Sequence, residues 1–141
     1  MVLAIVAASC SAKEAVKPSE ESVKASKALG LLQDMDRAYK AMDLKGVTAP
    51  VSTDFKSGLS EFETSVRKDI ETFSAVNLDI NIERVEESGD QVRIATHWYG
   101  KWQDKDVKET EGRGNAVFVF RDSAEMKLVE VLGDSPFGVV R

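Results

Sequence analysis

The hydrophobic pattern of this chain changes its period once, after Ala75, and this change limits the possible folds more than any other feature. Before that point, apolar residues recur every three or four positions, which is the spacing of one face of an α-helix. After it, apolar and polar residues alternate, which is typical of a half-buried β-strand. The chain is therefore expected to place its helices first and its strands second, the order of an α+β fold.

Two main helices are predicted before the change in period. The first starts at Ser19, whose side chain can cap it, and ends near Leu44; Gly30 interrupts it at a cost of about 1 kcal/mol. The second covers about residues 58–74, and the segment 60–63 fits a capping box. The apolar stripes that define the two helices are Ala28, Leu31, Leu32, Met35, Ala38, Tyr39 and Met42, and then Leu59, Phe62, Val66, Ile70 and Phe73.

Four strands are predicted after the helices, each joined to the next by a short polar turn. They cover about residues 76–83, 91–102, 115–121 and 127–132. Hairpins between strands that are consecutive in the sequence give an antiparallel meander. The expected fold class is α+β, with N-terminal helices packed on a four-stranded antiparallel meander sheet.

The first ten residues look like the end of a bacterial lipoprotein signal peptide. An apolar stretch at residues 2–8 precedes Ser9 and Cys10, the only cysteine of the chain. Small side chains suit the pocket of a signal peptidase, and a thiol at the new N-terminus accepts the lipid. The stretch is short and has no basic residue before it, so we interpret it as a truncated leader. The alternative is an apolar strand or helix with a buried cysteine.

The expected organisation is therefore a signal segment at residues 1–10, a polar tether at 11–22 and a single α+β domain at 23–141, since a chain of this length allows one core. Residues 2–8 are much too short to span a bilayer. The membrane would be reached only through a lipid on Cys10. The expected location is the bacterial cell envelope, with the protein lipid-anchored on the periplasmic or outer face.

Charge and composition exclude several classes of function. The net charge is −5, and acidic and basic residues alternate without a basic stripe, so nucleic acid is not an expected partner. His97 is the only histidine, which excludes the usual metal sites with two or three histidines. We expect no metal and no cofactor.

His97 is also the one candidate for a catalytic residue. It could act as a general base, assisted by Tyr99 on the same strand face or by Asp36 or Tyr39 from the first helix. The alternation of the strand favours a different placement, on the outer face of the sheet beside polar neighbours.

Six aromatic residues are candidates for the wall of a pocket that binds a small apolar molecule. Trp98 and Trp102 share one face of the second predicted strand. Such residues either fill the core between helix and sheet or, if the sheet curves enough, line a cavity. The six candidates are Tyr39, Phe62, Trp98, Trp102, Phe118 and Phe120.

The order of elements and four segments resemble the nuclear transport factor 2-like superfamily, which includes SnoaL-like polyketide cyclases and ketosteroid isomerase. The segments are AYKAMDLKG at residues 38–46, THWYGKW at 96–102, GNAVFVFR at 114–121 and KLVEVLGDSPFG at 127–138, the last being similar to the ending of small bacterial lipoproteins with this fold. The resemblance implies a cone, in which the helices cover a strongly curved sheet.

The resemblance does not select one function, because members of this superfamily bind small molecules, catalyse isomerisations or cyclisations, or act as dimeric assembly modules. We favour an exported, lipid-anchored, non-catalytic domain that binds a small apolar molecule or a protein partner and forms a homodimer. One alternative is a SnoaL-like or ketosteroid isomerase-like enzyme with an acid or base in the cone. The other is a purely structural dimeric assembly module.

Overall fold

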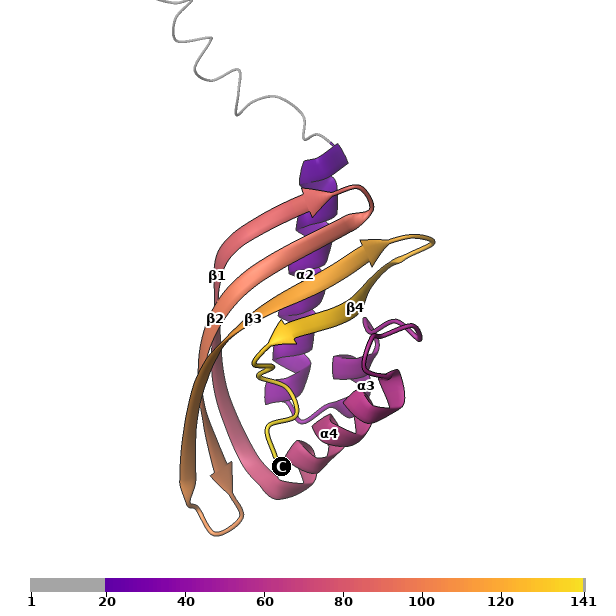
Figure 1. Ribbon diagram of the computed structural model, residues 1–141. Helices are drawn as coiled ribbons and strands as arrows, with labels where there is room; N and C mark the ends of the chain where they lie inside the picture. The colour runs from indigo at the N-terminus through magenta and orange to yellow at the C-terminus, as the bar shows by residue number, and fades with distance from the viewer. Residues whose placement is uncertain (1–19, 141) are drawn as a thin grey trace, which may run out of the picture.

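The computed structural model describes residues 20–140; Cys10, the predicted signal segment and most of the predicted tether lie outside these residues. Helices come first and strands second, as the change in period predicts (Figure 1). The elements are α2 (Glu20–Lys40), α3 (Leu44–Thr48), α4 (Leu59–Thr72), β1 (Phe73–Ser88), β2 (Gln91–Asp104), β3 (Glu109–Asp122) and β4 (Met126–Gly133). The predicted α+β fold class is confirmed.

The four strands form one antiparallel sheet in the order β1-β2-β3-β4, which confirms the predicted meander. The register shifts between Ile82 and Arg84 in β1, and again between Val119 and Phe120 where β3 pairs with β4. Such bulges increase the local twist and bend a strand. The sheet is strongly curved and gives the molecule its conical outline (Figure 1).

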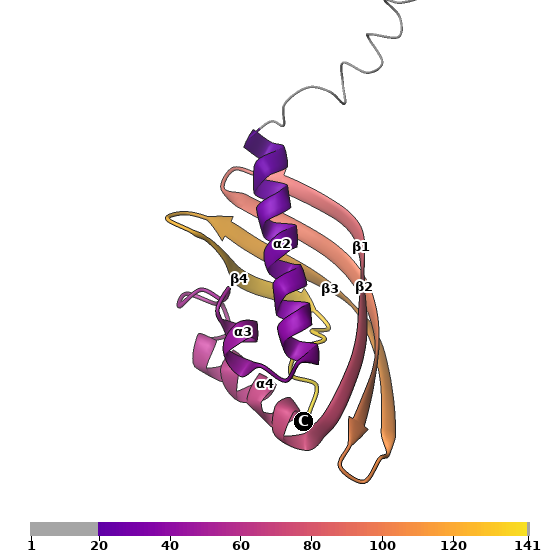
Figure 2. The same cartoon turned by 180° about the vertical axis from the view of Figure 1, so that it is seen from behind.

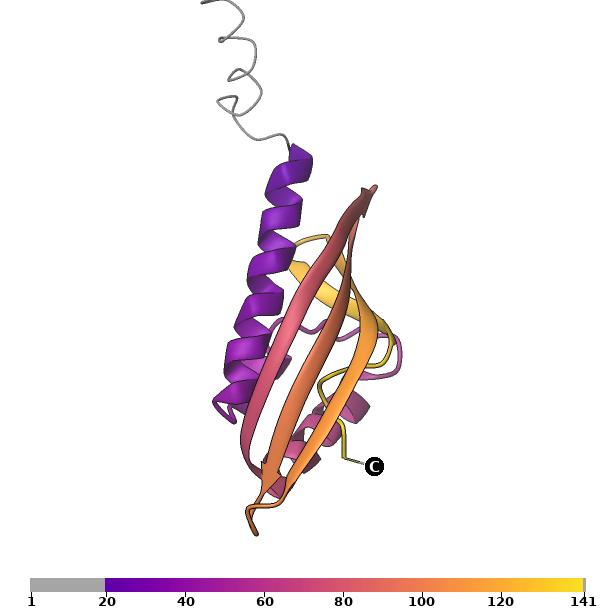
Figure 3. The same ribbon diagram turned by 90° about the vertical axis from the view of Figure 1, so that its left-hand side faces the viewer.

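Helix α2 lies along the concave side of the sheet, while α3 and α4 lie beside its lower end (Figures 2 and 3). The apolar face of α2 packs against the inward-facing residues of the strands. The most deeply buried residues of this core include Ala28, Met35, Tyr39, Leu78, Ile94, Phe118 and Phe120. Among the described residues, no helix is both long and apolar enough to cross a bilayer.

The predicted end of the first helix, near Leu44, is wrong. Helix α2 ends at Lys40, because the chain reverses at Met42 with a φ of 60°, and Leu44 belongs to the separate helix α3. The side chain of Asp43 caps this new helix by accepting a hydrogen bond from Gly46 N at 3.2 Å. Local apolar spacing continues across such a reversal and does not reveal it.

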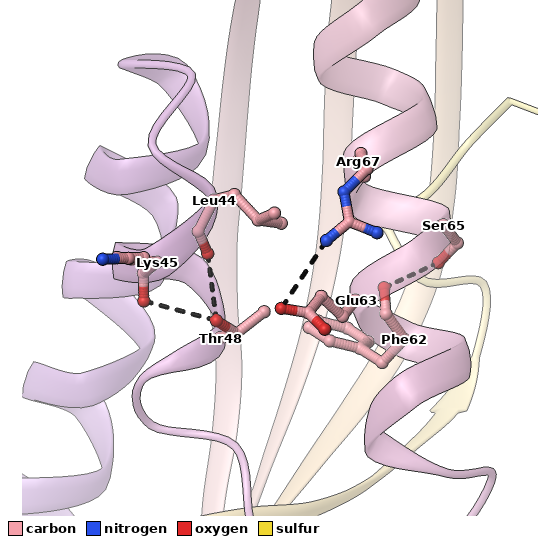
Figure 4. Close-up of polar contacts among 7 residues, drawn as sticks. All are labelled: Leu44, Lys45, Thr48, Phe62, Glu63, Ser65 and Arg67. Atoms are coloured by element: carbon pink, nitrogen blue, oxygen red, sulfur yellow. Dashed lines mark hydrogen bonds and ion pairs between the residues drawn. The ribbon is translucent and has the colours of Figure 1, made fainter.

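The predicted capping box of α4 is also wrong. The helix lies within the predicted range of about 58–74, but it begins after Gly58, whose φ of 101° turns the chain without a side-chain cap. Glu63 instead forms an i,i+4 ion pair with Arg67 at 3.9 Å (Figure 4). Figure 4 also shows one hydrogen bond within each of the helices α3 and α4. Thr48 Oγ1 donates to Leu44 O at 3.1 Å, and Ser65 Oγ donates to Phe62 O at 3.0 Å.

Candidate functional site

Two indole rings project from β2 into the concave side of the sheet and are seated on glycines. Trp98 is 6% exposed and Trp102 is 2% exposed, and their rings meet edge to face with centroids 6.0 Å apart. A Cβ atom added at Gly100 would lie 2.5 Å from Trp102 Cη2, and one at Gly114 would lie 2.9 Å from Trp98 Cζ2. The glycines of β2 and β3 therefore create the room that the indoles occupy.

A cavity of about 640 Å³ lies beside these two rings. Its other walls come from the start of β1, the outer part of β3 and the segment that follows β4. The lining residues are Phe73, Trp98, Trp102, Thr110, Glu111, Gly112, Arg113, Gly133, Asp134, Ser135, Gly138 and Val139. Its volume is typical of pockets that hold small molecules. We call it the indole cavity.

The indole N–H groups already have acceptors within the protein. Trp98 Nε1 donates to Asp134 O at 2.7 Å, and Trp102 Nε1 donates to Tyr39 Oη at 2.8 Å. The indoles can therefore offer a ligand their apolar surface and π-electrons, but no N–H donor. The charged residues of the lining, Glu111, Arg113 and Asp134, are exposed. The side chains of Glu111 and Arg113 lie beside Tyr99 on the outer face of the sheet, so these two residues contribute mainly backbone to the cavity wall.

A buried carboxylate lies behind the indole cavity. Asp69 on α4 is 1% exposed, and its Oδ2 accepts a hydrogen bond from Tyr39 Oη at 2.5 Å. The same oxygen accepts from Gly138 N at 2.7 Å and Val139 N at 2.9 Å, and Oδ1 accepts from Val140 N at 2.9 Å. Burial, followed by the charge of Asp69, raises the pKa of Tyr39 well above its ordinary value, so its hydroxyl stays protonated and donates.

The six aromatic residues predicted to line a pocket do not lie in one place in the structure. Trp98 and Trp102 line the indole cavity. Tyr39 accepts the hydrogen bond of Trp102 Nε1 but is not among the lining residues. Phe118 and Phe120 are fully buried in the core. Phe62 lines a different hollow of about 280 Å³, which it shares with Phe55 and Phe137 on the α4 side of the molecule.

His97 lies on the outer face of the sheet, as the strand alternation predicted. Its side chain is exposed, and Nδ1 lies 2.9 Å from Glu83 Oε2 of β1. Tyr99 shares this face, with the guanidinium of Arg113 5.4 Å from its ring centroid. The sheet stands between His97 and the two proposed helix partners, Asp36 and Tyr39, so the geometry offers no base inside the cone from this histidine.

No cluster of metal-ligating side chains was found among residues 20–140. Asp36, on α2, is a partly buried carboxyl outside this region. Burial raises its pKa, partly offset by Lys40, whose Nζ lies 3.2 Å from Asp36 Oδ2. This pair lies between α2 and β1 and does not contribute to the indole cavity.

Sequence reasoning missed two residues of this region, Asp69 and Phe137. A signal for Asp69 was present, because it lies three residues after Val66 and four before Phe73, on the apolar stripe of its helix. A carboxylate in that position has to find hydrogen-bond donors. Phe137 follows the last predicted strand, where no periodicity indicates which way a side chain points.

Comparison with known proteins identifies structural neighbours but no close relative in sequence. No protein-family model matches the chain, and no curated protein matches it. Among solved structures, it is similar to a nuclear transport factor 2-like superfamily protein from Salmonella enterica, with a TM-score of 0.70 and 12% identity over 85% of this chain and 96% of that chain.

Two further neighbours carry names that suggest an activity. One is a proposed aromatic ring hydroxylase from Novosphingobium aromaticivorans, with a TM-score of 0.66 and 18% identity over 85% of this chain and 92% of that chain. The other is a proposed dehydratase of the nuclear transport factor 2-like family from Streptomyces avermitilis, with a TM-score of 0.66 and 12% identity over 77% and 93%. At such identities, the likeness concerns the fold.

Proposed function

We propose that this chain, which has the nuclear transport factor 2-like fold, is a domain that binds a small, largely apolar molecule in the indole cavity. In this proposal the domain does not catalyse a reaction of the bound molecule. The observation that carries this proposal is the cavity itself, about 640 Å³ beside two indoles whose N–H groups are already bonded. The parts of the indoles that face the cavity can offer a ligand van der Waals and π contacts, but no N–H donor.

The charges around the cavity support binding over catalysis. Catalytic acids and bases usually have a perturbed pKa and a desolvated position within reach of the substrate. The carboxylates that line the indole cavity, Glu111 and Asp134, are exposed. The desolvated carboxylate, Asp69, is not a lining residue, and four hydrogen bonds already occupy it.

Fluorescence tests the proposal directly, because Trp98 and Trp102 are the two tryptophans of the chain and both line the cavity. The neutral probe N-phenyl-1-naphthylamine accepts energy from excited indole. We expect saturable transfer from tryptophan to bound probe.

Two glycine variants make this experiment specific to the cavity. Gly112→Val places new atoms beside Trp102 Cζ3, which is 3.3 Å from a Cβ at this position, and should weaken binding by about tenfold or more. Gly30→Ala adds a methyl group where no atom lies within 4 Å and should leave binding unchanged. Absence of transfer, or equal affinity in both variants, would contradict the proposal.

A second candidate function is an enzyme with an acid or base in the cone. The specific observation in its favour is the buried hydrogen bond between Tyr39 and Asp69, 2.5 Å long. A base at Asp69 would need the segment that covers it to move, because the cavity does not reach the carboxylate. The third possibility, a purely structural assembly module, needs no cavity and predicts that the probe does not bind.

We place the domain at the bacterial cell envelope, anchored through a lipid on Cys10. The support is the apolar stretch followed by small residues and a single cysteine. When the chain is expressed in a bacterium with a basic N-terminal extension before residue 2, it should incorporate labelled palmitate, and Cys10→Ala should abolish incorporation. Equal labelling of both forms would remove the anchor from the proposal.

The proposal also includes a homodimer formed through the outer face of the sheet. The half-buried Tyr99 and the exposed Arg113 lie on this face beside a shallow hollow of about 370 Å³. The test of this arrangement is given in the Discussion.

A further inference from the structure

The two edges of the sheet differ in how their backbone groups are used. The edge at β4 is covered, because Val51 pairs with Leu128 and Lys56 N donates to Val129 O at 2.9 Å. Strand β1 is 16 residues long and forms the other edge, beside α2 (Figure 3). No strand in the described part of the chain pairs with its outer side. An uncovered edge of this length can pair with another chain.

Hydrogen bonds in the neighbouring strands show which groups of β1 point toward β2. Asn115 O accepts from Asp134 N at 2.8 Å, on the side of β3 that faces away from β2. Asn115 lies opposite His97, so the backbone groups of His97 point toward β1. His97 in turn lies opposite Asn81, and these two residues therefore form a hydrogen-bonded pair.

The residues that alternate with Asn81 direct their backbone groups away from the sheet. These are Leu78, Ile80 and Ile82, and each has an N–H and a C=O at the free edge. Lys40 supports this assignment, because its Nζ reaches from α2 to Leu78 O at 3.4 Å. We call residues 78–82 the open edge.

Side chains at the open edge have different character on the two faces of the sheet. On the concave side, Ile80 is half-buried and Ile82 is 44% exposed. On the outer side lie the exposed side chains of Asp79, Asn81 and Glu83. A strand added here would meet aliphatic groups on one face and polar, acidic groups on the other.

The charges around the open edge are mainly negative. Asp36 on α2 is close enough to Asp79 for that charge to contribute to the raised pKa of Asp36, after burial, which is the main cause. Asp36 Oδ1 is buried and accepts no hydrogen bond among the described residues. The nearby cations are already paired, Lys40 with Asp36 at 3.2 Å and Arg84 with Glu86 at 3.0 Å. A basic partner is therefore complementary to this edge.

We propose that the open edge binds an extended peptide segment of a protein partner, in which basic and aliphatic residues alternate. The segment adds a strand to the sheet, and its backbone pairs with Leu78, Ile80 and Ile82. Its aliphatic side chains lie beside the two isoleucines. Its basic side chains lie on the outer face beside Asp79 and Glu83.

This inference does not rest on the proposed function. None of these residues lines the indole cavity. A dimer formed through the outer face leaves the backbone groups of a sheet edge free. Binding of the apolar probe without the peptide, or of the peptide without the probe, would show which of the two proposals has failed.

Amide hydrogen exchange on the full chain, followed by NMR, tests the inference with the peptide acetyl-Lys-Val-Lys-Val-Lys-Val-Lys-amide. At saturation, the amides of Ile80 and Ile82 should exchange at least about tenfold more slowly. The amide of Asn81 already bonds to β2 and should change little.

Two methylated peptides test the direction of pairing without altering the protein. The valines would lie opposite the isoleucines, so their N–H groups would point toward β1. N-methylation of the central valine should weaken binding by about tenfold or more, whereas N-methylation of a neighbouring lysine should leave it nearly unchanged. Equal effects of the two methyl groups would contradict strand addition.

A pair of charge variants tests the recognition of basic residues. Asp79→Lys should weaken binding by about tenfold or more. Glu125→Lys makes the same change of charge in the turn between β3 and β4 and should leave the affinity unchanged. The inference is overturned if both variants bind equally well, or if Ile80 and Ile82 are not protected by the peptide. Protection that grows with protein concentration in the absence of peptide would also overturn it, because the edge would then pair with a second copy of the chain.

Discussion

Single polar side chains connect parts of this molecule that are far apart in sequence. Trp102 on β2 donates to Tyr39 on α2, and Tyr39 donates to Asp69 on α4. Asp69 also accepts from the backbone amides of residues 138–140. Each group in this chain of bonds is buried, so the loss of one partner leaves another without compensation.

Tyr39→Phe should therefore destabilise the fold although it removes one oxygen atom. Trp102 Nε1 loses its acceptor and Asp69 loses a donor, and we expect the free energy of unfolding to fall by about 1–3 kcal/mol. Urea denaturation followed by tryptophan fluorescence measures this change. Tyr99→Phe removes the same atom from the outer face and should change stability by less than about 0.5 kcal/mol. Equal effects at the two positions would contradict the importance of the buried bonds.

The sequence contains part of this residue-level information. The stripe of α4 predicts that Phe62 and Val66 are buried, and both are. It also places Asp69 on the buried side, which indicates a need for donors. The donors themselves cannot be predicted, because they are backbone amides of residues 138–140, brought there by the path of the chain after β4.

At the scale of elements, the glycines of the helices show how the same residue type serves different purposes. Gly30 lies within α2, and a Cβ atom there would meet no atom within 4 Å. Gly46 lies in α3, where a Cβ atom would come within 2.6 Å of Asp43 Oδ2 and 2.7 Å of Ala38 Cβ. The first glycine therefore lowers helix stability without a packing reason, whereas the second allows α2 and α3 to approach.

Gly30→Ala and Gly46→Ala should change stability in opposite directions. Alanine restricts the unfolded chain and favours the helix, so Gly30→Ala should raise the free energy of unfolding by about 1 kcal/mol. Gly46→Ala should lower it, because Ala38 and the capping carboxylate of Asp43 would have to move. Thermal denaturation of the two variants side by side gives the sign. If Gly46→Ala instead raised the free energy of unfolding, the contact between α2 and α3 would have room for the added methyl group, contrary to the distances given above.

Element types followed from the sequence more reliably than element ends. The helix and strand periods are properties of the backbone, and each predicted strand is present. The ends depend on single conformations, such as the positive φ of Met42 and of Gly58, and on pairing. Strand β1 starts at Phe73, directly after α4, because its first residues pair with the end of β2.

At the scale of the whole molecule, the outer face of the sheet is the surface through which we propose that two copies meet. It carries polar and charged side chains, with the guanidinium of Arg113 over the Tyr99 ring and His97 beside Glu83. A two-fold dimer uses the same patch on both subunits, so opposite charges on one patch can pair across the axis.

Native mass spectrometry at micromolar concentration should therefore detect a dimer. Arg113→Glu places like charges on this patch and should weaken the dimer by about tenfold or more. Arg67→Glu, on the exposed side of α4, is the matched control and should leave the dimer intact. A monomer in the unaltered chain would contradict the dimer, and a dimer that resists Arg113→Glu would place the interface elsewhere. A dimer that fails to bind the apolar probe would favour the assembly module.

The sequence by itself determined the order of helices and strands, the antiparallel meander and the outward position of His97, because periodicity and short turns are local properties of the backbone. Only the tertiary structure decided which aromatic residues line a cavity. Trp102 lies 63 residues from Tyr39, its hydrogen-bond partner, and the glycines that seat its ring belong to two strands. Whether space is filled or open depends on contacts between segments distant in sequence, and such contacts have no local pattern.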